Sequence, residues 1–159
     1  MKIKVYSTDK AFPKFDGVAE LFRMFYTEME HQGLLLPLAS GGEKAWIDSL
    51  RQRLGKIAAL FVAEDANALL GFSSGFIKLL PAILGGGKIG FIDGLYVLPG
   101  YRGQKIASDL YSQIEDWLMQ QKVQNIELQV LVGNLAGYRF WQSKGYTAEL
   151  YQMRKIIKK

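Results

Sequence analysis

The segment GLYVLPGYRGQKIA, residues 94–107, contains the features of the sequence that decide the fold. It joins an apolar strand, expected over residues 88–98, to a helix expected over residues 102–121. Between them, a proline, a glycine and a tyrosine at positions 99–101 predict a turn. The helix is indicated by apolar residues at three- and four-residue spacing, which are Ile106, Leu110, Ile114, Trp117 and Leu118.

The start of this helix has the composition of a phosphate-binding site. Gly103, Ala107 and Ser108 are small enough to let a ligand approach the backbone. The first N–H groups of a helix have no internal partners and lie at the positive end of its dipole. Arg102 and Lys105 add positive charge. An ordinary strand–turn–helix connection, without a ligand, explains the same residues.

The rest of the chain predicts one domain of class α/β with the order β-α-α-β-β-β-α-β-α-β. Asp16 is a candidate N-cap for the first helix. The sheet is expected to be mixed, antiparallel at first and parallel around the helix at 102–121. The elements expected are strand 2–7, helix 15–31, helix 43–54, strand 58–64, strand 69–79, strand 88–98, helix 102–121, strand 126–132, helix 134–143 and strand 147–157.

The composition excludes several kinds of site. The chain has 159 residues, no cysteine and one histidine, His31. The absence of cysteine excludes disulfides, thiolate metal sites and cysteine nucleophiles, and a Ser-His-Asp triad could use only His31. Its 49% hydrophobic and 22% charged residues are ordinary for a globular protein. The apolar runs are too short to span a membrane, and the N-terminus lacks the apolar core of a signal peptide. We therefore expect a cytoplasmic protein without a bound metal.

The net charge of +5 is concentrated in the second half of the chain. Residues 1–80 contain 10 basic and 9 acidic residues, whereas residues 81–159 contain 10 basic and 6 acidic residues. The excess suggests an anionic partner, although a slightly basic surface without function explains it equally well. A nucleic-acid-binding domain is a further alternative, but the sequence has no helix-turn-helix or aromatic RNA-binding pattern.

Two motifs resemble those of the GNAT family of N-acetyltransferases. The first is Arg102-Gly103-Gln104-Lys105-Ile106-Ala107, which is similar to the family's pyrophosphate loop Arg/Gln-x-x-Gly-x-Gly/Ala but has Lys105 at the usual glycine. The second runs from Asn134 through Gly137 and Trp141 to Gly145-Tyr146, and is similar to the family's Asn-x-x-Ala-x-x-x-Tyr-x-x-x-Gly-Phe. Trp141 occupies the position of the tyrosine that, in the family, points at the coenzyme sulfur.

The resemblance implies an acyl-CoA N-acyltransferase fold over residues 1–159, with variable acceptor-side helices at 1–57 and a coenzyme-binding core at 58–157. It implies acetyl-CoA as the acetyl donor and a primary amine of a small molecule or peptide as the acceptor. The backbone of Leu95 and Val97 is expected to pair with the pantetheine arm. The implied coenzyme-binding residues are Leu95, Tyr96, Val97, Arg102, Gly103, Gln104, Lys105, Ile106, Ala107, Ser108, Asn134 and Trp141.

Two residues are candidates for proton transfer. Asp93 interrupts an apolar strand, and a partly buried carboxylate there is suited to take the proton of the amine. A structural role, pairing with a cation or capping a bulge at Gly94, explains Asp93 equally well. An indole cannot donate a proton as a phenol does, so Tyr138 is the candidate replacement for the missing tyrosine. Asn134 is expected to cap its helix, which by itself explains that residue.

These expectations lead to one main function and one alternative. The main function is direct transfer of an acetyl group from acetyl-CoA to an amine. The alternative is a CoA-binding sensor of the same fold that has lost turnover, which Lys105 and Trp141 motivate. We expect neither a nucleic-acid nor a membrane partner, and a homodimer is a reasonable assembly because symmetric pairs are the commonest oligomers.

Overall fold

A five-stranded sheet organises the protein, described here from a computed structural model covering residues 2–158. The strands lie in chain order, β1-β2-β3-β4-β5; the first four are antiparallel and β5 is parallel to β4. This confirms the predicted mixed α/β class. The elements are β1 Lys4–Ser7, α1 Phe15–His31, α2 Gly42–Arg53, β2 Ala58–Asp65, β3 Ala68–Leu79, a 3-10 turn Ala82–Leu84, β4 Lys88–Val97, a 3-10 turn Pro99–Tyr101, α3 Ile106–Gln120, β5 Ile126–Leu128 and α4 Leu135–Ser143.

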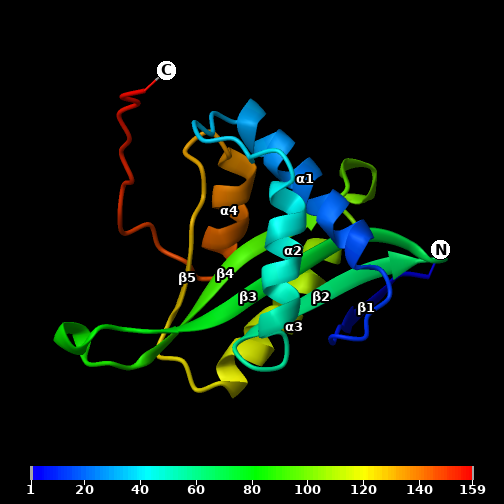
Figure 1. Cartoon of the computed structure of the whole chain (residues 1–159), viewed down its shortest axis with the longest axis horizontal. Helices are drawn as coiled ribbons and strands as arrows, with labels where there is room; N and C mark the ends of the chain where they lie inside the picture. Colours follow the sequence, from blue (N-terminus) through cyan, green and yellow to red (C-terminus); the bar gives the residue numbers. More distant parts are fainter. Residues whose placement is uncertain (1, 159) are drawn as a thin grey trace.

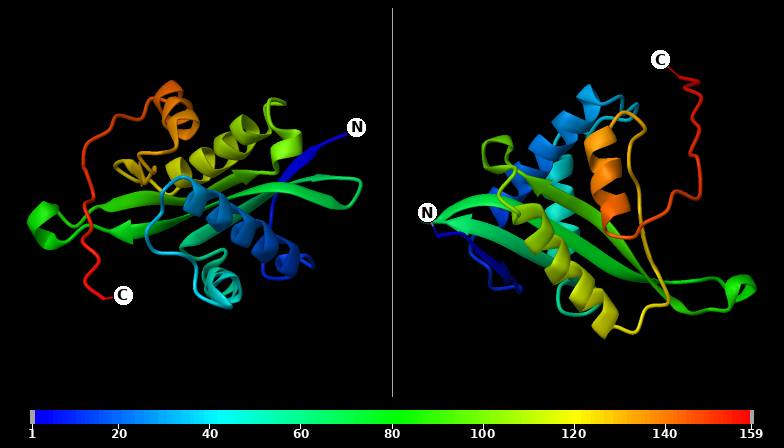
Figure 2. Two further views of the ribbon diagram at one scale, coloured as in Figure 1. Left: turned by 90° about the horizontal axis from the view of Figure 1, so that it is seen from above. Right: turned by 180° about the vertical axis from the view of Figure 1, so that it is seen from behind.

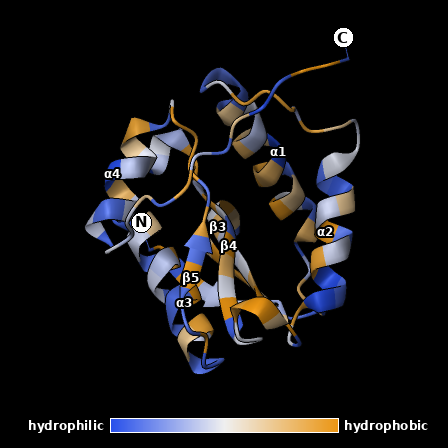
Figure 3. Cartoon of the chain, turned by 90° about the vertical axis from the view of Figure 1, so that its left-hand side faces the viewer, coloured by the Kyte–Doolittle hydropathy of each residue, from blue (hydrophilic) through white to orange (hydrophobic). Residues whose placement is uncertain are grey.

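The helices form a layer on each face of the sheet, as Figures 1 and 2 show. Figure 3 shows the same arrangement end-on, with α1 and α2 on one side and α3 and α4 on the other. Each face has its own apolar core. Val18, Leu50 and Phe72 are fully or almost fully buried on the α1/α2 face, and Leu110 and Ile114 on the α3 face. Burying both faces explains why β2 reads as an unbroken apolar run rather than an alternating one.

One helix cap and one helix start differ from the predictions. Helix α1 begins at Phe15, as predicted, but Lys14 is at the N-cap position, so the prediction that Asp16 caps this helix is wrong. Asp16 lies instead in the first turn, where a carboxylate still interacts favourably with the helix dipole. Helix α3 begins at Ile106 rather than at position 102, because Gly103 and Lys105 have left-handed backbone conformations that an α-helix cannot contain.

A bulge interrupts β4 beside the middle of the sheet, as Gly94 suggested. Ser74 of β3 is opposite Gly94 and Gly75 is opposite Ile92, so Asp93 is the extra residue. Asp93 bonds to Ser74, and a Cβ added to Gly94 would meet the side chains of Phe72 and Ser74. Both residues therefore face the α1/α2 layer, and the bulge rather than simple alternation sets the side-chain directions around this point.

The end of the chain contradicts the prediction of a strand over residues 147–157. Residues 147–157 form neither a helix nor a strand, and Figure 1 shows this segment running apart from the sheet and helices. Within residues 2–158 its backbone makes no hydrogen bond, because no neighbouring strand is in place to pair with it. Strand β5 is likewise shorter than the predicted 126–132 and ends at Leu128.

Candidate active site

A cleft of about 430 Å³ opens between α1, the end of β4, the start of α3, and α4. It brings together every residue predicted to bind the coenzyme except Gln104. The sequence did not identify the wall that α1 contributes, since nothing local to α1 indicates a ligand. The lining residues are Phe25, Glu28, Met29, Gln32, Leu95, Tyr96, Val97, Tyr101, Arg102, Gly103, Lys105, Ile106, Ala107, Ser108, Asn134, Ala136, Gly137, Phe140 and Trp141.

Unpartnered backbone N–H groups form one end of the cleft. Among residues 2–158, none accepts a hydrogen bond from the N–H groups of residues 103–108, the loop before α3 and the first helical turn. A Cβ added to Gly103 would find no atom within 4 Å, so the space in front of the loop is open. Six successive donors at the positive end of a helix are suited to a pyrophosphate. The residues present therefore fit the phosphate end of a coenzyme A molecule.

Lys105 adopts a backbone conformation that usually belongs to glycine. Its φ of 66° and ψ of 10° lie in the left-handed region, at the N-cap position of α3. A non-glycine residue pays roughly 1–2 kcal/mol for this conformation. The turn therefore keeps the shape that glycine would give it, and Lys105 adds a positive charge to the cleft lining.

The exposed edge of β4 forms the middle of the cleft. Strand β5 pairs with β4 only at Gly90, Phe91 and Ile92, and no strand within residues 2–158 covers that edge further on. The N–H of Leu98 donates to the carbonyl of Leu70 on the β3 side, at 2.8 Å. Antiparallel alternation then directs the polar backbone groups of Leu95 and Val97 toward the exposed edge. An extended amide chain can pair there as an additional strand would.

Arg102 is engaged with protein groups rather than free in the cleft. Its Nη1 and Nη2 donate to the two carboxylate oxygens of Glu28 at 2.8 and 2.7 Å. Its Nε donates to the carbonyl of Val97 at 2.9 Å, so that acceptor on the β4 edge is already occupied. The hydrogen bonds to Glu28, together with its charge, raise the pKa of Arg102, while burial, followed by the charge of Glu28, raises the pKa of Tyr96. Arg102 therefore links α1 to the end of β4.

Helix α4 forms the opposite wall through Asn134 and Trp141. The Oδ1 atom of Asn134 accepts from the N–H of Gly137 at 2.9 Å, which confirms the predicted N-cap, and Asn134 also lines the cleft. Trp141 packs edge-on against Tyr111 and Tyr146, with ring centroids 5.5 and 5.4 Å apart. Its indole is thereby fixed at the cleft wall.

Tyr138 lies outside the cleft, which counts against its predicted role as a substitute acid. It is 39% exposed and does not line the cleft, unlike Gly137 and Trp141 on the same helix. Its place in the sequence, one residue after Gly137, turns its side chain about 100° away around the helix. Ala136, Gly137, Phe140 and Trp141 line the cleft and span about 140° of the helix, and Tyr138 lies about 60° beyond Trp141, outside that range.

Asp93 is held at the bulge by two donors from different elements. Ser74 Oγ donates to one carboxylate oxygen at 2.8 Å, and Trp46 Nε1 donates to the other at 3.3 Å. Ser74 is completely buried and Trp46 is stacked on Phe22 with ring centroids 3.9 Å apart, so both donors are themselves fixed. Within residues 2–158 no cation forms an ion pair with Asp93. Nothing local in the sequence connects Asp93 with Trp46, which is 47 residues away.

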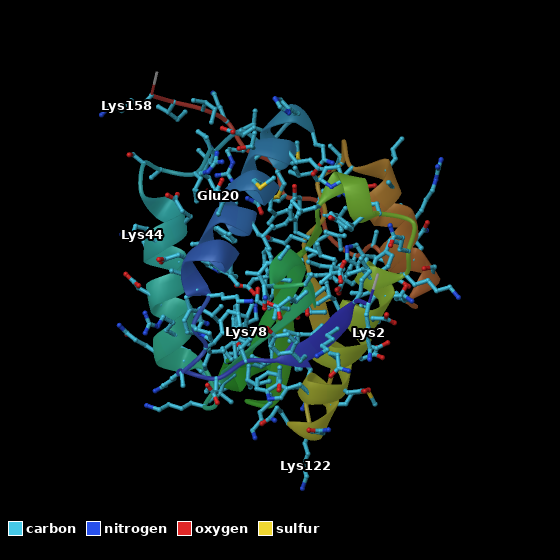
Figure 4. All side chains as sticks on the ribbon, turned by 90° about the vertical axis from the view of Figure 1, so that its right-hand side faces the viewer. Lys2, Glu20, Lys44, Lys78, Lys122 and Lys158 are labelled. Carbon is cyan, nitrogen blue, oxygen red and sulfur yellow. The ribbon has the colours of Figure 1, made fainter. Side chains whose placement is uncertain are left out.

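We also searched for membrane-spanning helices, clusters of metal-ligating side chains and a basic surface patch. Over residues 2–158, no helix combines the length and apolar character needed to cross a membrane, and no cluster of three or more potential metal-ligating His, Cys, Asp or Glu side chains occurs. In Figure 4 the labelled Lys44, Lys122 and Lys158 lie at separate parts of the outline, so these basic side chains do not form one patch.

The fold is shared with solved acetyltransferase structures. One, from Clostridium acetobutylicum, is described as a predicted acetyltransferase with acetyl-CoA; it is 14% identical, with 98% of this chain and 96% of that chain covered and a TM-score of 0.76. The aminoglycoside N-acetyltransferase AAC(6')-Iy in complex with CoA is 16% identical, with coverages of 97% and 95% and a TM-score of 0.75. Glucosamine-6-phosphate N-acetyltransferase from Arabidopsis thaliana is 15% identical, with coverages of 99% and 100% and a TM-score of 0.69.

Sequence comparison gives the family directly. No curated protein matches the chain at a significant level. The family model described as "Acetyltransferase (GNAT) family" matches residues 16–146, which include the cleft and both motifs identified in the sequence. The match, the sheet with its bulged fourth strand and the N–H-lined turn before α3 agree, and the chain belongs to the GNAT family of acetyltransferases.

Proposed function

We propose that this protein transfers an acetyl group from acetyl-CoA to a primary amine of a small molecule or peptide. The observation that carries the proposal is the juxtaposition, in one cleft, of the unpartnered N–H groups of residues 103–108 and the exposed edge of β4 at Leu95–Val97. The first can hold a pyrophosphate and the second an extended amide chain. The loop of residues 103–108 suits the phosphate half of coenzyme A, and the edge of β4 suits its amide-containing pantetheine half.

Support for the donor and acceptor comes from similar structures. One structural neighbour is described with acetyl-CoA and another, an aminoglycoside N-acetyltransferase, with CoA. An aminoglycoside carries primary amines, so acetylation of an amine is chemistry that this fold accommodates.

The chain's own residues supply three roles in the proposed reaction. Acetyl-CoA, when bound, supplies an acetyl group activated as a thioester. The N–H groups of residues 103–108 bind its phosphates, and Lys105 adds positive charge nearby. The backbone of Leu95 and Val97 orients the arm along β4, and an N–H group of this exposed edge stabilises the negative charge that develops on the thioester oxygen. Asn134 and Trp141 form the wall on the other side.

Asp93 is the proposed base. An alkyl ammonium has a pKa of about 10.4, so near neutral pH the amine must lose a proton before it attacks. The Asp93 carboxylate is partly exposed at the bulge, two residues before Leu95, and its orientation is fixed by Ser74 and Trp46. It accepts the proton directly or through a water molecule. The leaving thiolate is only moderately basic, with a thiol pKa of about 8.5, so the reaction does not need a strong acid at position 141.

The second candidate function is a sensor that binds acetyl-CoA without turnover. The observation in its favour is that Trp141 occupies the cleft wall where the family has a tyrosine, while Tyr138 lies outside. Both candidates require the same coenzyme site. Release of CoA in the presence of an amine distinguishes them.

The test is a thiol-release assay preceded by calorimetric titration of acetyl-CoA. The chain contains no cysteine, so a thiol reagent reports CoA without background from the protein. Binding in the micromolar range, about −8 kcal/mol, is expected. Thiol release that requires both acetyl-CoA and a member of a primary-amine panel supports transfer. Binding without release for every amine supports the sensor, and absence of binding contradicts both.

A further inference from the structure

An aromatic surface adjoins Asp93 on the face of the sheet that α1 and α2 cover. Phe76 of β3 and Phe91 of β4 are paired across the two strands just beyond the bulge, with ring centroids 5.3 Å apart. Phe76 packs against the α1/α2 core, and its ring lies against that of Phe91, so both rings face the same layer as Asp93. Both side chains are only partly buried. A flat apolar surface therefore lies beside the proposed base.

Helix α2 places two of its side chains over this part of the sheet. Trp46 and Arg53 are seven residues apart, so they lie on the same face of the helix, about 10 Å apart along its axis. Trp46 donates to Asp93, and the guanidinium carbon of Arg53 lies 5.4 Å from the ring centroid of Phe76. One face of α2 therefore has a carboxylate near one end and a guanidinium at the other.

Within residues 2–158, the positive charge of Arg53 has no anionic partner, although the side chain is partly buried. Its Nε donates to the carbonyl of Ser49 at 3.3 Å, and over the same residues its two Nη atoms make no hydrogen bond. By contrast, Lys78 lies 5.0 Å from the ring centroid of Phe91 and is paired with Glu127 at 3.5 Å. A guanidinium with free Nη groups is suited to bind a carboxylate or phosphate through two parallel hydrogen bonds.

The helix dipole does not account for the direction in which Arg53 points. A basic residue in the last turn of α2 interacts favourably with the dipole, and Arg51 in the same turn does so as well. Arg51 is exposed and its guanidinium lies 4.8 Å from the ring centroid of Phe15, on another side of the helix. Of these two arginines, Arg53 is the one directed at the surface beside Asp93. Arg51 therefore provides a matched control.

We infer that the acceptor amine carries an anionic group about 10 Å from its nitrogen, with an apolar or aromatic body between them. The inference rests on the proposed function, because it places the amine at Asp93. The anion binds the Nη atoms of Arg53, and the body lies on Phe76 and Phe91. The opposite charges at the two ends orient the acceptor with its amine at the base. A tripeptide with a free amine and a free carboxylate belongs to this class, since three extended residues span about 10 Å.

The first test compares two tripeptides that differ only in the charge at one end. Gly-Phe-Gly has a free carboxylate, and its C-terminal amide is neutral at that end. In the thiol-release assay with acetyl-CoA, kcat/KM for the acid is expected to exceed that for the amide at least tenfold. Arg53→Gln is expected to remove this preference by raising the KM of the acid, whereas kcat/KM for the amide stays within twofold. Unchanged turnover of the amide also shows that the variant is folded.

Two further variants control for the loss of a charge from α2. Arg51→Gln is expected to keep the tenfold preference, because Arg51 faces away from the surface beside Asp93. Arg53→Lys is expected to keep part of it, because the positive charge remains without the planar fork. Equal use of the acid and the amide by the parent protein, or a preference that survives Arg53→Gln, overturns the inference.

The second test measures binding without turnover, so that the inference and the proposed function can fail separately. Each tripeptide is titrated by calorimetry into the protein saturated with CoA. The acid is expected to bind at least tenfold more tightly than the amide, and Arg53→Gln is expected to remove the difference. This result without CoA release from acetyl-CoA for any amine would contradict the proposed transfer and support the anion site. CoA release with equal binding of the two tripeptides, or no binding of either, would overturn the inference.

Discussion

Arg102 and Glu28 form a two-pronged ion pair, 2.8 and 2.7 Å long, between the turn that leads into α3 and the helix α1. The motif around Arg102 predicts a residue directed at the coenzyme phosphates, whereas its guanidinium holds helix α1 against the end of β4. Phosphate binding in the proposed site therefore depends on the backbone of residues 103–108 more than on this arginine.

The first prediction follows from that ion pair. Arg102→Lys removes the planar fork that bonds both oxygens of Glu28, and the bond to the Val97 carbonyl is lost with it. Because both side chains are partly exposed, we expect a loss of only about 1 kcal/mol in the free energy of unfolding. Urea unfolding measures it. The affinity for acetyl-CoA is expected to change by less than threefold, and a tenfold loss would show that Arg102 binds the phosphates directly.

The second prediction concerns the phosphate end of the cleft. Gly103→Glu places a carboxylate beside the unpartnered N–H groups and a side chain at a residue with φ of 81°. Acetyl-CoA affinity measured by calorimetry is expected to fall at least tenfold, about 1.4 kcal/mol. Gly85→Glu is the matched control, since Gly85 also has a left-handed φ, of 97°, and open space but lies on the β3–β4 connection. Equal affinities for the two variants would remove the phosphate site from this loop.

The third prediction separates the shape of the loop from its charge. Lys105→Gly removes the strain of a left-handed lysine, so the thermal midpoint is expected to rise, with a gain of about 1 kcal/mol in stability. Affinity for acetyl-CoA is expected to fall only a few-fold, because the backbone donors keep their positions. Thermal unfolding and calorimetry measure the two effects. A lower midpoint would mean that the Lys105 side chain stabilises the turn.

The fourth prediction tests the proposed base. Asp93→Asn keeps acceptor and donor atoms near Ser74 and Trp46 but cannot take up the amine proton. Turnover at neutral pH is expected to fall at least 100-fold. Acetyl-CoA affinity is expected to stay within twofold. Asp48→Asn, an exposed carboxylate on α2, is the control and should leave turnover unchanged. Turnover preserved across the pH range would exclude Asp93 as the base.

The fifth prediction concerns stability at high pH. Burial, together with a hydrogen bond to Glu115, raises the pKa of Tyr111 above its ordinary value of 10.0, and burial also raises the pKa of Tyr146. Above about pH 10 the unfolded chain loses these protons while the folded protein keeps them. Their contribution is therefore complete below pH 10 and is lost as the pH rises toward the folded-state values, by at most about 1.4 kcal/mol per pH unit for each tyrosine.

Urea unfolding between pH 9 and 11 measures this loss. Tyr111→Phe is expected to make the decline in the free energy of unfolding shallower. Tyr151→Phe is the matched control, because Tyr151 is 91% exposed and should leave the slope as it is in the parent protein. Parallel slopes for all three proteins would show that the Tyr111 hydroxyl titrates at its ordinary pKa in the folded state.

Local patterns were enough to predict most of the fold. Apolar spacing located α3 and the β2–β3 hairpin, and an asparagine at a helix start located the cap at Asn134, because each depends on residues close together in the chain. Gly94 suggested a bulge as one explanation of Asp93, and the structure has a bulge at this point. The strand predicted at 147–157 failed for a different reason. A sequence can indicate an extended segment, but pairing requires a neighbour, and a single chain places none beside it.

The site was predictable where the backbone forms it and not where distant side chains do. Residues 103–108 are contiguous, so their donors could be inferred from one motif. The partners of Arg102 and Asp93 come from α1, α2 and β3, and Glu28 is 74 residues from Arg102. Tyr138 was misjudged because its spacing from Trp141 places it near that side chain but about 60° beyond the part of α4 that lines the cleft.

The bulge at Asp93 also determines how β4 would respond to the deletion of one residue. Asp93 and Gly94 face the same layer, so Leu95, Tyr96 and Val97 keep the sides that an uninterrupted strand one residue shorter would give them. Loss of either bulge residue would leave every later side chain of β4 in its present core. Either loss would remove the bulge, and loss of Asp93 would also remove the carboxylate, while the pairing of the sheet would remain. One inserted residue in β4 therefore creates the bulge at Asp93 without changing which side chains of the strand face each hydrophobic core.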